Sequence, residues 1–184
     1  MSVSGNLTQD NLKDICSAIK RSNCGIELDL SSCTGLTDIG EDAFYNCSNL
    51  VKIVLPNTVK TIGKDAFECC YDLAEVQLSN SLETIGYQAF EQCSNLTSIQ
   101  IPYSVKVIEE WAFYCCSKLD INIPYTVTAI GRFGLYNVKS ITFGRQYNWY
   151  TTYYSYDWIN KENGESVDIL SEDTYQYNKY YYRN

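Results

Sequence analysis

The sequence predicts a solenoid, a stack of near-identical backbone coils built on short parallel strands. Segments of closely similar sequence begin at Asp42, Asp65 and Gln88, and so recur every 23 residues. Aligning them gives columns, which are positions that carry one residue type in successive copies. The clearest are Ile39, Ile62, Ile85, Ile108 and Ile130, and Phe44, Phe67, Phe90 and Phe113, with Leu135 last. A lone coil cannot bury its apolar side, whereas stacked coils bury each column against its own copies.

Each copy is predicted to contain a strand, a turn and an extended return segment. Residues 50–56, LVKIVLP, alternate as a short strand does, and residues 42–47, DAFYNC, indicate a single helical or 3-10 turn. Residues 58–63 form a second extended piece that ends in glycine. Gly40, Gly63, Gly86 and Gly131 each follow an isoleucine of the first column, and this glycine column suggests a corner with positive φ. Glu109 interrupts this column, so either the corner tolerates a side chain or the fourth coil is strained.

The chain divides into three parts. Residues 1–35 are predicted to form a helical N-terminal cap and an irregular first coil, 36–144 the repeats, and 145–184 a Tyr-rich C-terminal cap. Thr8 suits an N-cap, and Leu12, Ile15, Cys16 and Ile19 fall on one helical face. The last 40 residues hold ten tyrosines and two tryptophans. Three interpretations stay open: a cap over the last coil, an aromatic surface that binds glycans or proteins, or a flexible tail.

Residues 39–56, IGEDAFYNCSNLVKIVLP, resemble the BspA-like (bacterial surface-protein A-like) leucine-rich repeat, which reads roughly IGxxAFxxCxxLxxIxIP. The resemblance covers about residues 36–143; four copies are close, and the fifth lacks the cysteine and the proline. The period also falls in the leucine-rich range. The fold expected is a leucine-rich-repeat solenoid of about five coils, an α/β repeat with a short parallel sheet and short helical or 3-10 turns. The resemblance further implies a cell-surface or secreted protein, often linked to adhesion.

Composition excludes several classes of function. The net charge is −8, and residues 26–144 carry 14 acidic and 7 basic side chains, which disfavours nucleic acid and anionic membranes as partners. The sequence contains no run of 18 apolar residues, so it does not predict a membrane-spanning helix. The first residues lack a signal peptide, so the protein is either cytoplasmic or has lost a leader. Histidine is absent, which removes Ser–His and Cys–His catalysis within the chain. We expect no metal and no cofactor.

Nine cysteines raise the question of disulfides. The column Cys47, Cys70, Cys93 and Cys116 has parallel Cα–Cβ vectors, so we expect buried thiols in it instead of bridges. The sequence allows a disulfide between Cys24 and Cys33 but does not decide whether it forms. The odd total leaves at least one thiol free or intermolecular, which argues against an oxidising compartment unless the habitat is anaerobic. The neighbouring carboxylates Glu109 and Glu110 indicate a solvated surface, because a glycosidase places its pair in a cleft.

The outward residues of the predicted strands are the candidate binding site. They are mostly small or polar and differ from coil to coil, which suits a modular binding face but also any solvated sheet. They are Lys52, Val54, Glu75, Gln77, Ser98, Gln100, Asn122, Ser140 and Thr142. Tyr103 and Tyr125 each follow a proline that ends a strand, so we expect them side by side at the sheet edge. They are either a binding hot spot or simple edge packing.

The sequence therefore predicts a monomeric, non-catalytic module for protein binding or adhesion, with an extracellular-matrix or cell-surface protein as its partner. An intracellular interaction scaffold of the same fold is the first alternative. A carboxylate-dependent, glycan-active enzyme is the second, and a fragment whose C-terminal segment docks another domain is the third.

Overall fold

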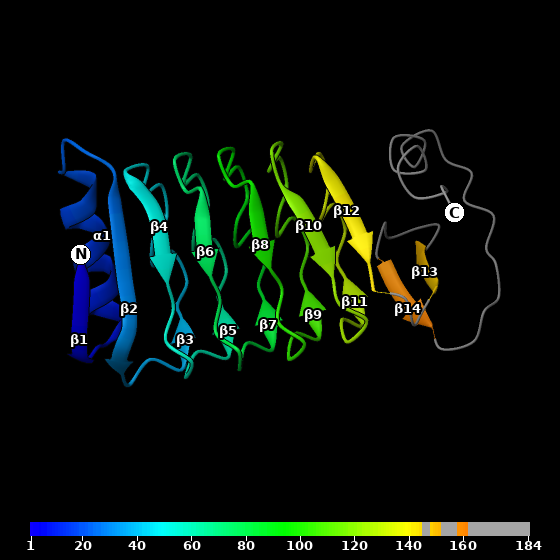
Figure 1. The fold of residues 1–184 in the computed structure, drawn as a ribbon, viewed down its shortest axis with the longest axis horizontal. Coiled ribbons are helices and arrows are strands. Elements are labelled where there is room, and N and C mark those ends of the chain that lie inside the picture. The colour runs from blue at the N-terminus through cyan, green and yellow to red at the C-terminus, as the bar shows by residue number, and fades with distance from the viewer. Residues whose placement is uncertain (145–147, 152–157, 162–184) are drawn as a thin grey trace.

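The computed structural model describes residues 1–144, 148–151 and 158–161. Within them the chain is a stack of coils whose strands lie side by side along one axis (Figure 1). The predicted Tyr-rich cap, 145–184, lies outside the described residues except for two short strands.

Among the described residues the first sheet holds seven strands, of which all but the first are predicted from the sequence. They are β1 (Ser2–Asn6), β2 (Ile26–Thr34), β4 (Leu50–Val54), β6 (Glu75–Gln77), β8 (Ser98–Gln100), β10 (Asp120–Ile123) and β12 (Ser140–Phe143). All neighbours are parallel, and the apolar column Ile53, Val76, Ile99, Ile121 and Ile141 is in register. Since β2 joins the same sheet, the described part has six coils, one more than the five counted from the repeats.

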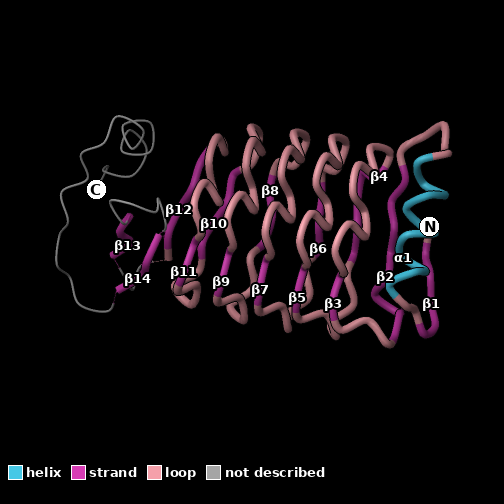
Figure 2. Tube along the Cα trace, turned by 180° about the vertical axis from the view of Figure 1, so that it is seen from behind, coloured by secondary structure: helices cyan, strands magenta, loops and turns pink. Residues whose placement is uncertain are grey.

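A second parallel sheet is formed by the extended return segments (Figure 2). Its strands are β3 (Asp38–Ile39), β5 (Thr61–Ile62), β7 (Thr84–Ile85), β9 (Val107–Ile108) and β11 (Ala129–Ile130). After β11 the sheet continues antiparallel through β14 (Trp158–Lys161) and β13 (Asn148–Thr151). The isoleucine column thus lies in register along this sheet.

The third side of each coil, which we call the turn side, differs from the single helical or 3-10 turn expected. Some amides donate to the carbonyl three residues back, as from Tyr45 to Asp42 at 3.1 Å. The amides between them donate to the next coil, as from Phe44 to Ala66 at 2.8 Å. In the five coils whose turn side is described, two residues each have positive φ, which interrupts a helix. They are Asp42 and Asn46, Asp65 and Cys69, Gln88 and Gln92, Trp111 and Cys115, and Phe133 and Asn137.

The glycine column is needed for a different reason from the one predicted. The column glycines are not among the glycines with positive φ. A Cβ at Gly86 would lie 2.6 Å from the carbonyl oxygen of Ile62, so the glycines allow close approach of successive coils. In other coils the glycine amide donates to the isoleucine carbonyl of the coil before, as from Gly86 to Ile62. The Glu109 amide makes the same bond, to Ile85 at 2.8 Å. The corner therefore tolerates a side chain at this position.

The core is a set of side-chain ladders between the three sides. Phe44, Phe67, Phe90 and Phe113 are fully buried and stack nearly parallel, with ring centroids 5.2, 5.1 and 5.2 Å apart. This single row is what the repetition predicts, because each ring packs on the ring of the coil before it.

At the N-terminal end of the stack lies helix α1 (Gln9–Lys20), beside β1 and β2 (Figure 1). Thr8 is its N-cap and forms a capping box with Asn11, as the sequence suggests for Thr8. Leu12, Cys16 and Ile19 are buried in the core, whereas Ile15 is half-buried. Strand β1 has no counterpart among the sequence predictions.

Candidate binding surface

The outward side chains of the first sheet form two rows across the coils. The first row is Glu27, Lys52, Glu75, Ser98, Asp120 and Ser140, and the second is Asp29, Val54, Gln77, Gln100, Asn122 and Thr142. All the residues proposed from the strands are in these rows. Between them the inward residues are buried, so the rows face away from the core. The sequence interpretation omitted Glu27, Asp29 and Asp120, although the alternation of Leu28 and Leu30 with the two acids indicated the first two.

Charged groups of the first row form ion pairs, either within the row or with a neighbouring lysine. Lys52 Nζ lies 2.7 Å from Glu75 Oε1, and the hydrogen bond to this carboxylate raises the pKa of Lys52. Asp120 accepts hydrogen bonds from Lys139 Nζ at 2.7 Å and from Ser140 Oγ at 2.5 Å. These bonds lower the pKa of the Asp120 carboxyl, and the bond from Lys139 has the larger effect. Since the groups are exposed, the pairs contribute little to stability.

The second row is neutral over its central coils. Gln77, Gln100 and Asn122 are exposed, and in the described part of the chain no hydrogen bond joins their side-chain amides to other residues. Their donors and acceptors therefore face solvent.

Tyr103 and Tyr125 lie at the corner that follows the second row. Their ring centroids are 5.7 Å apart and the rings are tilted by 49°. Tyr103 is 67% exposed and Tyr125 40%. The pair therefore presents aromatic surface to solvent next to the exposed amides.

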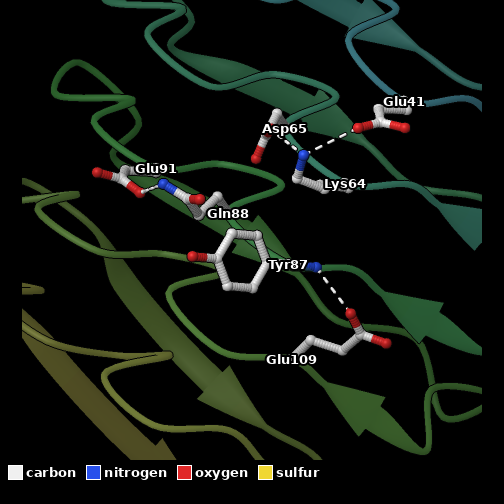
Figure 3. A network of polar contacts seen from close by, with 7 residues as sticks. All are labelled: Glu41, Lys64, Asp65, Tyr87, Gln88, Glu91 and Glu109. Carbon is white, nitrogen blue, oxygen red and sulfur yellow. Dashed lines mark hydrogen bonds and ion pairs between the residues drawn. The ribbon is translucent and has the colours of Figure 1, made fainter.

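Carboxylates gather on the turn side (Figure 3), where Glu41 and Glu109 bind groups of a neighbouring coil, and Asp65 and Glu91 bind groups of their own coil. Lys64 Nζ lies 2.9 Å from Glu41 and 3.3 Å from Asp65. Gln88 donates to Glu91, and the Tyr87 amide donates to Glu109 Oε2 at 2.8 Å.

The carboxylates of Glu109 and Glu110 do not face one another across a shared site. Glu109 binds the Tyr87 amide, whereas Glu110 accepts a hydrogen bond of 3.0 Å from the indole nitrogen of Trp111.

Burial, and then the charges of Asp65 and Glu91, raise the pKa of Glu68. Among the described residues no group of three or more Cys, Asp or Glu is arranged to hold a metal ion.

An aromatic cluster on the turn side was missed by the sequence interpretation. Trp111 and Tyr114 have ring centroids 4.5 Å apart, and Tyr114 stacks on Tyr136 at 5.1 Å. Phe133 packs between Trp111 and Tyr136. The signal was present in two columns. In one, Asp42, Asp65 and Gln88 are followed by Trp111 and Phe133; in the other, Glu68 and Glu91 are followed by Tyr114 and Tyr136.

All nine cysteines are free thiols in the structure. The expected buried column forms a ladder of hydrogen bonds: the Sγ atoms of Cys70, Cys93 and Cys116 donate to the carbonyl oxygens of Phe44, Phe67 and Phe90, at 3.1, 3.2 and 3.0 Å. The bridge left open between Cys24 and Cys33 is not formed: Cys24 is exposed, and Cys33 is buried and donates to the Val3 carbonyl oxygen.

Comparison with known proteins decides the family. The family model described as a BspA type leucine rich repeat region matches six copies over residues 22–178. The chain belongs to this family. The match begins within the segment interpreted as the N-terminal cap and extends beyond residue 144. Curated proteins gave no significant match.

Solved structures of bacterial leucine-rich repeat proteins are similar to this BspA-type chain. A Treponema pallidum leucine rich repeat protein is 35% identical, with a TM-score of 0.60, over 64% of this chain and 58% of its own. A leucine rich cell surface protein from Faecalibacterium prausnitzii is 28% identical, with a TM-score of 0.61, over 68% and 33%. A Eubacterium ventriosum repeat protein, 23% identical with a TM-score of 0.57 over 86% and 42%, shares the fold. The alignments thus span about three-fifths and one-third of the first two relatives.

The described residues contain one helix, α1, which is too short to cross a membrane.

Proposed function

We propose that this chain is a non-catalytic protein-binding module that acts at a cell surface, and that the two rows of the first sheet with Tyr103 and Tyr125 are its contact surface. One observation carries the proposal: the core columns are nearly invariant from coil to coil, whereas the outward residues on the same strands change. A rigid scaffold of this kind loses little conformational entropy on binding.

Similarity supports the cellular site. One of the similar structures is a leucine rich cell surface protein. The partner proposed is an extracellular-matrix or cell-surface protein, bound by the chain as a monomer. Weak contacts of one module gain strength where several modules act together.

The geometry of the acids also favours a non-catalytic role. Glu109 and Glu110 each hold a different hydrogen-bond donor, so they do not form the pair of facing carboxyl groups that glycoside hydrolysis needs.

The test is a pull-down of purified extracellular-matrix proteins by the immobilised chain. We expect capture of at least one protein and its loss in the double variant Tyr103→Ala/Tyr125→Ala, because exposed aromatic residues are frequent hot spots. Lys106→Ala is the matched control, since Lys106 is exposed beside the second sheet. Equal capture by parent and double variant would remove the tyrosines from the contact surface, and no capture would remove the proposal.

One observation favours the alternative of an intracellular scaffold with the same contact surface. All nine cysteines are free, which suits a reducing compartment. The two proposals differ in where the chain is found: surface labelling of intact cells detects it under the first, and it is detected only after lysis under the second.

A further inference from the structure

The exposed amide residues of the second row and the two tyrosines at the corner beside it form one neutral surface, which we call the amide–tyrosine patch. It consists of Gln77, Gln100, Asn122, Tyr103 and Tyr125. Gln100 lies in register with Asn122, and the pairing of Val76 with Ile99 sets Gln77 beside Gln100. The patch therefore offers one amide per coil over three successive coils, with aromatic rings along one side.

The chemistry of the patch suits hydroxyl groups. Each amide has two donor hydrogens and an acceptor oxygen, and a sugar hydroxyl both donates and accepts. An exposed tyrosine ring offers an apolar face to the C–H groups of a sugar ring and a phenol at its edge. Tyr103, which is 67% exposed, is placed for this contact.

The charges around the patch select against an anionic ligand. Residues 26–144 carry 14 acidic and 7 basic side chains. The one lysine of the first row, Lys52, is paired with Glu75. A sulfated or carboxylated chain is therefore repelled, and a neutral one meets amides that have no competing partner in the described structure.

The spacing of the coils favours one kind of polymer. Successive coils are 5.1–5.2 Å apart at the stacked phenylalanines, and neighbouring strands lie about 4.8 Å apart. Successive rings of an extended β-1,4-linked hexose chain advance by nearly the same distance. Such a chain along the solenoid axis places one sugar beside each amide. Successive sugars are turned over, but each edge carries hydroxyl groups that an amide can bond.

Protein segments fit the patch less well. An extended peptide presents side chains to one face only every ~6.7 Å, so it falls out of step within three coils. A helix advances ~5.4 Å per turn but docks through an apolar stripe. Among the described second-row residues only Val54 is apolar, and it is half-buried.

We infer that the amide–tyrosine patch binds a neutral, extended, β-1,4-linked glycan chain that lies along the solenoid axis. This inference rests on the proposed function, since it names the chemical group through which a surface partner is held.

Calorimetric titration with tetrasaccharides tests the inference. The probes are β-1,4-linked tetrasaccharides of glucose, N-acetylglucosamine and mannose, together with the α-1,4-linked tetrasaccharide of glucose. The last has the same sugar as the first but a coiled chain that is out of step with the coils. We expect at least one β-1,4 probe to bind, and the α-1,4 probe to bind at least about tenfold more weakly.

Variants locate the site. Tyr103→Ala and Gln100→Ala should each weaken the bound β-1,4 probe by about tenfold, whereas Lys106→Ala should leave its affinity unchanged. All these residues are exposed, and circular dichroism checks that the variants fold. The inference is overturned if no β-1,4 probe binds, if the α-1,4 probe binds as well, or if Tyr103→Ala and Gln100→Ala bind like the parent.

A second arm separates this inference from the proposed function. Matrix proteins captured in the pull-down are treated with glycosidases and tested again. Loss of capture supports the glycan inference. Capture that survives deglycosylation but is lost in Gln100→Ala overturns it and leaves protein binding standing, with a peptide or helix as the group recognised.

Discussion

The Sγ atom of Cys93 donates a hydrogen bond of 3.2 Å to the carbonyl oxygen of Phe67, one coil earlier in the stack. The same carbonyl oxygen accepts a second hydrogen bond from the backbone amide of Cys70, also at 3.2 Å. The cysteine column thus joins neighbouring coils through side chains, at positions where the backbone alone leaves one lone pair of each carbonyl unused.

Replacing Cys93 with alanine should lower the free energy of unfolding by about 1–2 kcal/mol, because it removes a buried sulfur and a buried hydrogen bond. Urea-induced unfolding followed by circular dichroism measures the change. Cys69→Ala is the control: Cys69 is only half-buried on the turn side, and its loss should matter less. Equal costs for the two variants would show that the ladder adds nothing.

Alkaline pH should destabilise the fold through the same column. Burial raises the pKa of Cys70 to about 12 from its ordinary value of 9.0, and raises the pKa of Cys93 and of Cys116 as well. As pH rises through 9, thiols of the unfolded chain ionise first, which draws the equilibrium toward unfolding. The contribution is complete below pH 9 and is lost progressively toward pH 12.

This dependence is measured as the urea midpoint at pH 7, 8.5 and 10. The double variant Cys70→Ala/Cys93→Ala should show a shallower decline than the parent, because two of the shifted thiols are gone. A parallel decline in the two proteins would assign the alkaline effect to tyrosines and lysines instead.

Thiol reagents should distinguish three classes of cysteine in the folded protein. Cys24 is exposed and should react first; Cys69 and Cys115 are half-buried and should follow. The other six are buried and should react only as the chain unfolds. Timed alkylation followed by peptide mass spectrometry gives the order. Early labelling of Cys93 would contradict the buried ladder.

Adding one methyl group at Gly86 should cost about 1–3 kcal/mol, because its Cβ would meet the Ile62 carbonyl oxygen at 2.6 Å and force two coils apart. Glu109→Ala occupies the same column and should stay within about 0.5 kcal/mol of the parent, since its exposed carboxylate is replaced by water at the Tyr87 amide. Thermal unfolding of both variants checks the contrast. A harmless Gly86→Ala change would show that the coils can separate freely.

Repetition explains why much of the fold could be predicted. Ile53 and Val76 share a column in the sequence and lie opposite each other in neighbouring strands, and the phenylalanine column stacks ring on ring. The identity of each core contact is legible because a residue packs mainly on its own copy. The outward direction of Gln100 and Asn122 follows from the same alternation.

Features that depend on contacts between coils were harder to predict. The left-handed conformations of Trp111 and Cys115 are imposed by hydrogen bonds to the next coil, although neither residue type favours them. The glycine column reflects the approach of a neighbouring backbone, which a single coil does not reveal. Strand β1, Ser2–Asn6, has little apolar alternation and is recognisable only by its pairing with β2.

On the turn side, every second amide is bonded within its own coil and the others to the coil that follows. A gene segment encoding one coil can therefore be duplicated or lost in frame without leaving backbone groups unmatched inside the protein. Each duplication lengthens every surface row by one residue. Selection can then alter that residue separately while the residues of the other coils stay unchanged.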